Sequence, residues 1–179
     1  MKSNDELVVP EGVSVSVEPP FVSVSCKSSS LRRRLFDPVV SIRVADGKVL
    51  FSAAKGSRNE KRKIGTFRAH IRNMFCGVTQ GHFYRLKVCA SHFPVTVSVQ
   101  GAIFSVKNFL GEKVPRTMKL RPGVDVKVNG DIIEVRSIDK EAASQTAADI
   151  ENLTRRANVD LRVFQDGCYI IEKDGVMIK

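Results

Sequence analysis

The feature that most constrains the fold is an internal repeat. Residues 13–24 (VSVSVEPPFVSV) are matched 82 positions later by residues 95–106 (VTVSVQGAIFSV). Residues 40–44 (VSIRV) are matched 84 positions later by residues 124–128 (VDVKV). Two copies are too few for a solenoid, which needs at least about three stacked units, so the repeat predicts a duplicated domain.

Each copy has the pattern of a small antiparallel sheet. Apolar residues alternate with Ser, Thr or charged residues, which is typical of strands with one face on a core and the other in water. Turn-forming residues separate the expected strands, because Gly, Asn, Asp and Pro tolerate the backbone angles of tight turns. These turns are expected at Pro19-Pro20, Ala45-Asp46-Gly47, Gln100-Gly101 and Asn129-Gly130.

Each copy ends in a segment with helical period. Apolar residues recur at steps of three and four from Ile64 to Val78, and again from Ala143 to Ala157, with Asp139 as the expected N-cap of the second helix. One helix would cover the buried face of each sheet. The sequence therefore predicts an α+β fold of two tandem duplicated domains, each a small, mostly antiparallel β-sheet packed with one α-helix.

The boundary between the copies is expected near residue 82, giving a first domain at 1–82 and a second at 83–179. Residues 79–93 span this boundary, and from 83 to 90 alternate residues are apolar. This alternation predicts a strand, which we expect to close the first sheet and to lead directly into the second domain.

The charge of the chain favours a polyanionic partner. Twenty-nine Lys and Arg against nineteen Asp and Glu give a net charge of +10, which suits nucleic acid or an anionic membrane. No run of about 20 apolar residues could span a bilayer, and the N-terminus has no apolar signal core. The four cysteines lack the spacing of a disulfide framework, which favours reduced thiols in a cytosolic setting.

The basic residues are most concentrated in the segment 107–123 (KNFLGEKVPRTMKLRPG), where five Lys and Arg stand against one Glu. These charges cannot all be buried without partners, so the segment either lies in water or binds a polyanion. In the first copy, Arg32, Arg33 and Arg34 follow one another in a strand-like context and must alternate between faces. Basic residues also surround the first helix, which could suit an anionic membrane, but the apolar face of that helix is needed to cover its sheet.

Catalytic and metal-binding patterns are weak. Cys89 and His92 have the spacing of half a zinc site, but no second pair accompanies them. No phosphate-binding glycine motif and no nucleophile elbow occurs. The carboxylate pairs Asp139/Glu141 and Asp149/Glu151 are better explained by helix capping and by local balance with Lys140 and the pair Arg155-Arg156. The sequence thus predicts no enzyme, no cofactor, no metal and no small-molecule substrate.

Three strings are specific enough to suggest a family. Residues 108–113 (NFLGEK) together with 118–124 (MKLRPGV), residues 89–97 (CASHFPVTV) and residues 162–173 (RVFQDGCYIIEK) resemble the large-subunit ribosomal protein six family, called protein nine in the eukaryotic convention. The tail string resembles the archaeal and eukaryotic branch of this family. The order of the strings and the duplicated domain match it as well.

The resemblance implies a structural protein of the large ribosomal subunit that supports translation. It implies binding to large-subunit rRNA near the base of the factor-binding stalk and the sarcin-ricin loop, beside neighbouring large-subunit proteins. It implies a cytoplasmic location in the ribosome, and the nucleolus during assembly in a eukaryote. The alternative is an RNA-binding module outside the ribosome. The expected RNA contacts, mainly in the second domain, are Lys107, Asn108, Lys113, Arg116, Lys119, Arg121, Arg162, Gln165, Tyr169, Arg32 and Arg34.

Folded rRNA is bound by shape and phosphate contacts more than by base sequence, which suits Lys and Arg on loops. The chain departs from the family pattern at residues 53–64 (AAKGSRNEKRKI), which keep the basic character but lack the Trp that eukaryotic members often carry there. This difference bears on the contacts of the first domain.

Overall fold

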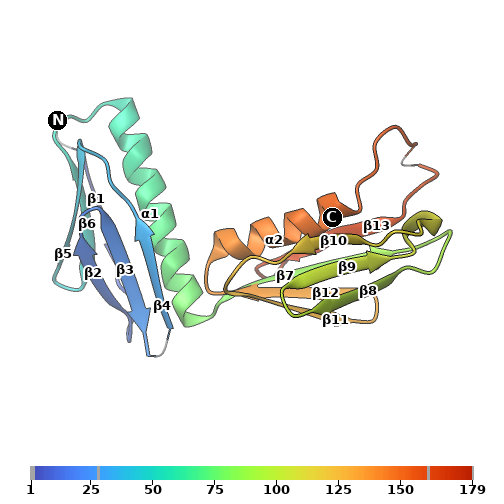
Figure 1. Cartoon of the computed structure of the whole chain (residues 1–179). Coiled ribbons are helices and arrows are strands. Elements are labelled where there is room, and N and C mark those ends of the chain that lie inside the picture. The colour runs from blue at the N-terminus through green and yellow to red at the C-terminus, as the bar shows by residue number, and fades with distance from the viewer. Residues whose placement is uncertain (1–2, 28, 161, 179) are drawn as a thin grey trace. The chain divides into compact units, whose positions relative to one another are not determined.

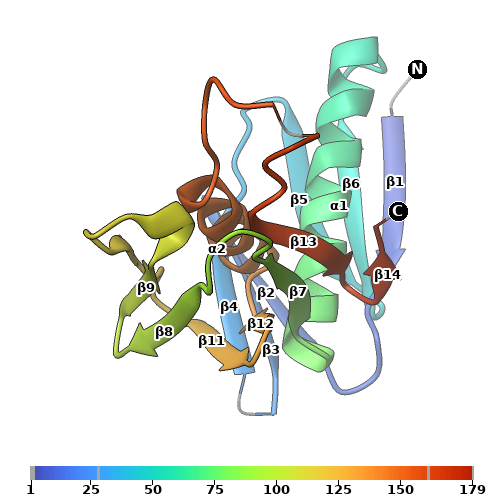
Figure 2. The same cartoon turned by 90° about the vertical axis from the view of Figure 1, so that its right-hand side faces the viewer.

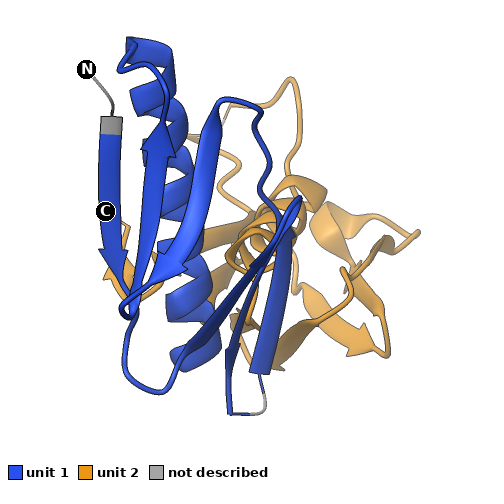
Figure 3. Ribbon diagram, turned by 90° about the vertical axis from the view of Figure 1, so that its left-hand side faces the viewer, with its two compact units in different colours: residues 1–81 blue, residues 82–179 orange. Residues whose placement is uncertain are grey.

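The chain folds as two units that repeat one succession of strands and helix (Figure 1). The computed structural model describes residues 3–27, 29–160 and 162–178. The units are Met1–Gly81 and His82–Lys179, which Figure 3 colours separately. Both combine antiparallel sheets with one long helix, so the predicted α+β class with tandem duplicated domains is confirmed.

The first unit contains two small antiparallel sheets, with strand orders β1-β6-β5 and β2-β3-β4. Asp46 and Gly47 join β5 to β6 with φ angles of 51° and 69°, as a two-residue hairpin loop requires. The elements of this unit are β1 (Ser3–Val8), β2 (Ser14–Glu18), β3 (Phe21–Cys26), β4 (Ser29–Arg34), β5 (Val40–Ala45), β6 (Lys48–Ala53) and α1 (Arg58–Thr79).

Helix α1 packs on both sheets of the first unit. Its residues Ile64, Ile71 and Met74 are buried in one cluster with Val24 of β3 and Phe51 of β6. The helix begins at a capping box, in which Ser57 Oγ accepts from the Glu60 amide and the Glu60 carboxylate accepts from the Ser57 amide. The apolar face of α1 is therefore used inside its own unit, as the sequence predicts.

Some of the basic residues on α1 pair within the unit. Arg68 Nη1 lies 3.1 Å from Asp5 Oδ2 of β1. Lys63 Nζ lies 2.6 Å from Asp37 Oδ2, and this hydrogen bond lowers the pKa of the Asp37 carboxyl. These pairs reduce the positive charge that α1 presents to an external partner.

The second unit repeats the β2-β3-β4 sheet of the first unit and has a larger counterpart of the β1-β6-β5 sheet. The strand orders are β10-β9-β8 and β11-β12-β7-β13-β14. Its elements are β7 (His82–Cys89), β8 (Thr96–Gln100), β9 (Ile103–Lys107), the 3-10 turn η1 (Phe109–Gly111), β10 (Arg116–Lys119), β11 (Val124–Asn129), β12 (Ile132–Ser137), α2 (Lys140–Leu153), β13 (Gly167–Lys173) and β14 (Val176–Met177).

The core of the second unit lies where α2 meets both sheets. Leu86 of β7, Phe104 of β9, Ile133 of β12 and Ile150 of α2 are fully buried in it. Phe109 of η1 belongs to the same cluster, so the start of the basic segment is anchored in the core.

The strand predicted across the boundary exists as β7, but the prediction that it closes the first sheet was wrong. Strand β7 pairs with β12 on one side and with β13 on the other, and so lies in the middle of the large sheet of the second unit (Figure 2). Its first residue, His82, is buried and bonds through Nδ1 to Asp174 Oδ2 of the β13–β14 turn at 3.0 Å. Alternation predicts a strand but not its partners, because these lie far away in the sequence.

Helix α2 begins as predicted and ends earlier than predicted. Asp139 is the N-cap, and its Oδ1 accepts from the Glu141 amide at 3.0 Å. The helix ends at Leu153, so Ala157 lies outside it, contrary to the helical period read from the sequence. Arg116 Nη1 donates to the Leu153 carbonyl at 2.8 Å, which satisfies a terminal carbonyl from another part of the chain.

The charge balance predicted at the end of α2, by Arg155 and Arg156, was wrong in its partners. Asp149 pairs with Arg121 and accepts from the Gln145 amide, while a Glu151 oxygen accepts from the Ile170 amide. Lys140 lies near Asp174. In the described chain, Arg155 and Arg156 form no ion pair with Asp149 or Glu151, because both arginines follow the end of the helix, where the chain turns away.

Candidate nucleic-acid interface

The basic loop, residues 107–121, connects β9 to β10 and continues past the end of β10. Lys107, Lys113 and Lys119 are exposed along it. Within the part of the chain that the structure describes, none of the three forms an ion pair. Three lysines whose charges are not neutralised therefore lie along this hairpin, one at the end of β9, one in the connection and one at the end of β10.

The conformation of the basic loop is fixed from inside. Asn108 adopts a left-handed conformation, with φ of 59°, and its Nδ2 donates to the Pro94 carbonyl at 2.9 Å. Leu110 packs against the core, and Gly111, with φ of 77°, allows the turn that follows. Asn108, a predicted RNA contact, thus holds the loop against the start of β8.

Arg116 is the most engaged of the predicted RNA contacts. Its Nε and Nη2 donate to both oxygens of Glu112 at 2.8 and 2.6 Å, and its guanidinium lies 4.6 Å from the centre of the Phe109 ring. The hydrogen bond from Arg116 lowers the pKa of the Glu112 carboxyl. With the Leu153 carbonyl as a further acceptor, Arg116 ties the basic loop to the end of α2.

Arg121 is half engaged. Its Nη2 lies 3.1 Å from Asp149 Oδ2 on α2, and about half of its side chain remains exposed. A pair this open to solvent is weak and can exchange its partner for a phosphate. Arg121 therefore remains available as an RNA contact.

The tail residues predicted to contact RNA lie before and within β13. Arg162 pairs with Asp160 in a two-point contact, although its side chain is 90% exposed. Gln165 Nε2 lies 3.5 Å from the Arg162 carbonyl, so both residues belong to one turn. Tyr169 is 38% exposed on β13, and partial burial raises the pKa of its phenol.

A pocket of about 810 Å³ joins the basic loop to this tail. The pocket is lined by Leu110 of the loop, the end of α2, the segment after it, Phe164 and residues 166–169 of the tail. Of the predicted contacts, Tyr169 alone lines the pocket; Arg162 and Gln165 belong to the turn that carries Phe164 but do not line the pocket themselves.

The sequence reasoning missed Arg155 and Arg156, which line the same pocket. Both are exposed, and within the described residues neither forms an ion pair. Their adjacency just after a helix is the signal in the sequence that marks them, and the prediction that they balance the helix carboxylates hid it.

Arg32 and Arg34 lie in the other unit, on β4. Both are exposed while Arg33 between them is half-buried, so the predicted alternation of faces is confirmed. Arg32 lies over the Phe21 ring at 4.1 Å. The structure thus brings the predicted contacts of the second unit together around the loop and tail, while these two arginines form a separate basic strand.

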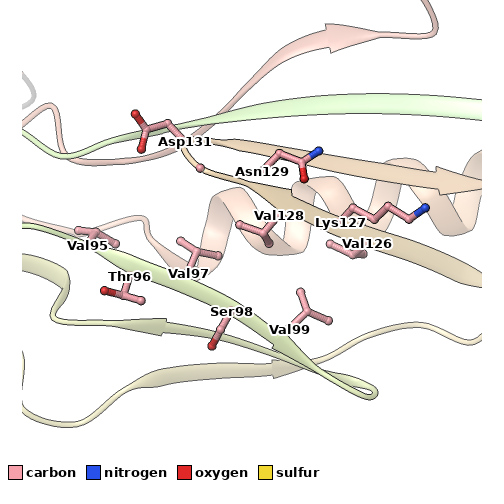
Figure 4. Close-up of a pocket in the computed structure, with 11 residues that line it drawn as sticks. Val95, Thr96, Val97, Ser98, Val99, Val126, Lys127, Val128, Asn129 and Asp131 are labelled. Atoms are coloured by element: carbon pink, nitrogen blue, oxygen red, sulfur yellow. The ribbon is translucent and has the colours of Figure 1, made fainter.

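A second hollow, of about 790 Å³, lies between the edge strands β8 and β11. Figure 4 shows that Val97 and Val99 of β8 and Val126 and Val128 of β11 line it. Lys127, also in its wall, lies 3.6 Å from Asp125. Because Lys127, the one lysine in its lining, is paired with Asp125 and Asp131 adds a carboxylate, this hollow between the two sheets is a poor candidate for binding phosphate.

The thiols and imidazoles do not assemble into a reactive site within the described residues. Cys89 lies half-buried in β7, whereas His92 bonds to Asp166 and stacks on Phe164 at 5.1 Å. Burial raises the pKa of the Cys168 thiol to about 11, so the thiol is protonated at neutral pH. Groups of three or more potential metal ligands are absent from the residues searched.

No helix in the described chain has the length and the apolar character required to cross a membrane.

Comparison with known proteins identifies the family. The large ribosomal subunit protein uL6 of Methanococcus vannielii is 41% identical over 174 residues, which cover 97% of this chain and 96% of that protein. The protein of the same name from Natronomonas pharaonis is 41% identical over 167 residues, covering 93% of this chain and 94% of its own length. Ribosomal protein L6 also matches as a family, at residues 9–81 and again at residues 93–167, which correspond to the two repeats. The chain therefore belongs to the ribosomal protein L6 family, whose members are structural proteins of the ribosome rather than enzymes.

Proposed function

We propose that this chain is a structural constituent of the large ribosomal subunit and binds large-subunit rRNA mainly through its second unit. The observation that carries the proposal is the basic loop, in which Lys107, Lys113 and Lys119 are exposed without ion pairs among the described residues, on a backbone held by Asn108 and Arg116. Charges held in place in this way suit phosphates of folded RNA, because little ordering remains to be done on binding. The names of the relatives support the large subunit as the particle.

Within this proposal the predicted contacts take different roles. The lysines of the loop, Arg121, Arg162 and Gln165 meet the RNA, while Asn108 and Arg116 keep the loop in shape. Arg32 and Arg34 on β4 add a basic strand from the first unit. We place the site near the base of the factor-binding stalk and the sarcin-ricin loop, next to other large-subunit proteins, in ribosomes of the cytoplasm and in the nucleolus during assembly if the source is a eukaryote.

The test is incorporation into particles. A tagged variant carrying Lys107→Glu, Lys113→Glu and Lys119→Glu should leave the large-subunit fractions of a sucrose gradient and accumulate near the top. The matched control makes the same change of charge at Lys87, Lys127 and Lys173, which are exposed on strands of the same unit away from the loop. If the loop variant sediments with large subunits as the wild type does, the assigned RNA face is wrong. A wild-type protein found only near the top would favour the RNA-binding module outside the ribosome.

Chemical probing of rRNA in particles with and without this protein tests the location. Differences in reactivity are expected at the stalk base and the sarcin-ricin loop. Differences confined to other regions of the rRNA would contradict the location while leaving membership of the large subunit intact.

A further inference from the structure

The pocket between the basic loop and the tail has walls of unusual composition for a site that binds only phosphate. It presents two guanidinium groups, two side-chain amides and two aromatic rings, from Arg155, Arg156, Asn152, Asn158, Phe164 and Tyr169. Its volume of about 810 Å³ lies within the range of about 300–1,000 Å³ typical of small-molecule sites. Amides can read the edge of a nucleobase and aromatic rings can stack on its face.

The carboxylates in the wall are already engaged by other groups. Asp166 accepts from the amides of Ser91 and His92, at 2.6 and 3.2 Å, and also bonds to the His92 ring. Glu151 accepts from the Ile170 amide at 3.3 Å. The two arginines, in contrast, form no ion pair within the described residues, although the charge of Arg156 helps to lower the pKa of the Glu112 carboxyl. The mouth of the pocket is therefore suited to a ligand that carries phosphate.

The rings are held in place before any ligand binds. Phe164 is 36% exposed and its other face stacks on His92. Tyr169 is 38% exposed and lies close over Gly167, where an added Cβ would come within 3.3 Å of the tyrosine ring. Because their positions are fixed by neighbours, these rings lose little conformational freedom when a base stacks against them.

We infer that this pocket accepts one unpaired nucleobase of the rRNA that the basic loop binds. This inference rests on the proposed function and adds a base contact to a surface otherwise suited to phosphates. RNA is favoured over a protein side chain because the exposed ions in the lining of the pocket, Arg155 and Arg156, are both cations. The arginines would bind the phosphates on either side of the base, while the amides and rings would contact the base itself.

The test fills the pocket with a large side chain and leaves unmutated every residue proposed to contact the base. Ala157 is exposed and lines the pocket, so Ala157→Trp should fill it. The full-length variant is bound to an rRNA fragment covering the stalk base and the sarcin-ricin loop, and the reactivity of base edges is probed. The wild type should protect one unpaired base. Ala157→Trp should lose that protection and bind roughly 5- to 150-fold more weakly, the equivalent of about 1–3 kcal/mol for a stacked base, with an unchanged dependence on salt.

The matched control is Ala102→Trp, on the exposed turn between β8 and β9 of the same unit, which should bind and protect as the wild type does. A second variant, Arg155→Gln with Arg156→Gln, should lower the salt slope by about 0.7–0.9 for each phosphate that the arginines no longer bind. Free mononucleotides should not displace the fragment, because they lack the neighbouring phosphates bound by the loop.

Four outcomes would overturn the inference. Binding and protection by Ala157→Trp equal to those of Ala102→Trp would show that no base enters. If particles that contain Ala157→Trp lose a neighbouring protein while the rRNA protection is unchanged, the pocket binds a protein rather than a base. Displacement by mononucleotides would assign it to a free nucleotide. A wild type that fails to bind the fragment would instead contradict the proposed function, and the inference with it.

Discussion

The connection between β3 and β4 and the connection between β9 and β10 occupy equivalent places in the two units but differ in length and content. The first joins Cys26 to Ser29, whereas the second joins Lys107 to Arg116 and contains η1. The strand registers are equivalent: Val24 pairs with Leu31 in the first unit, and Val106 pairs with Arg116 in the second. The basic loop is therefore an extended version of an ordinary hairpin connection rather than an added tail.

The residue at the start of the returning strand shows what the extension required. Leu31 packs by its apolar side chain against the core of the first unit. Arg116, at the equivalent position, binds Glu112 of the longer loop and the Leu153 carbonyl of α2. A longer loop has more conformational freedom to lose, and Arg116 supplies interactions that fix it. A hairpin that serves only the fold needs an apolar residue there, whereas a loop that presents charge needs a polar anchor.

The largest expected effect is a loss of stability when a buried core residue of either unit is truncated. Phe104 is fully buried, and its counterpart in the first unit is Val22. Phe104→Ala should destabilise the second unit by about 3–5 kcal/mol through loss of buried surface and creation of a cavity, and Val22→Ala should cost the first unit less. Hydrogen exchange measured peptide by peptide would assign each loss to its unit. Equal loss of protection in both units after either change would contradict their description as separate bodies.

An effect of intermediate size is expected when Arg116 is replaced by leucine, the residue at the equivalent position of the first unit. Arg116→Leu copies Leu31 and leaves the Leu153 carbonyl without its partner, so we expect a cost of about 1–3 kcal/mol in hydrogen-exchange protection of the end of α2. The control Arg116→Lys keeps the charge but loses the two-point hydrogen bonding, and should fall between the variant and the wild type. If Arg116→Leu keeps the full hydrogen-exchange protection at the end of α2, the basic loop does not need Arg116 to keep its conformation.

The pH dependence of this anchor has a definite sign. The pKa of Glu112 is lowered in the folded chain, so the contribution of the Glu112–Arg116 pair is present above the unfolded value, about 4.3, and is lost as pH falls through the folded pKa. The wild type should therefore lose in acid the part of its advantage over Arg116→Leu that comes from the ion pair, while the part that comes from the Leu153 carbonyl remains. An advantage that stays constant down to about pH 3, below the unfolded value, would contradict the role given to the ion pair.

The smallest effect concerns Arg121. Because its pair with Asp149 is largely exposed, Arg121→Gln should change the stability of the second unit by less than about 1 kcal/mol while weakening RNA binding. Urea unfolding combined with a double-mutant cycle with Asp149→Asn would measure the pair alone. A larger coupling energy would make Arg121 a second anchor of the loop rather than an RNA contact.

Local patterns in the sequence were sufficient for most of the fold. The repeated alternation predicted the hairpins, the spacing from Ile64 to Val78 predicted α1, and the cap at Asp139 predicted the start of α2. Each of these signals lies within a few residues of the structure that it specifies. The duplication strengthened them, because each half predicted the other.

Contacts between distant segments escaped prediction. The neighbours of β7 were assigned wrongly because β12 and β13 follow much later in the chain. The end of α2 depends on Arg116, which comes from another strand, and the place of Arg155 and Arg156 beside the tail depends on how the chain turns after the helix. A charged residue in the sequence gives no sign of whether it faces a carboxylate or solvent, so the roles of Arg116 and Lys119 could not be separated in advance.

The central place of β7 also bears on the order in which the chain can fold during its own synthesis. The described strands of the first unit have all emerged by residue 53 and its helix by residue 79, so this unit can fold early. Strand β7 is synthesised next and can pair with β12 only once residues 132–137 have emerged. Its other edge has no hydrogen-bonded strand beside it until residues 167–173 have emerged. The tail that completes the pocket is thus the same segment that completes the sheet, and the pocket proposed to accept a base does not exist on a nascent chain until residues 164–169 have emerged.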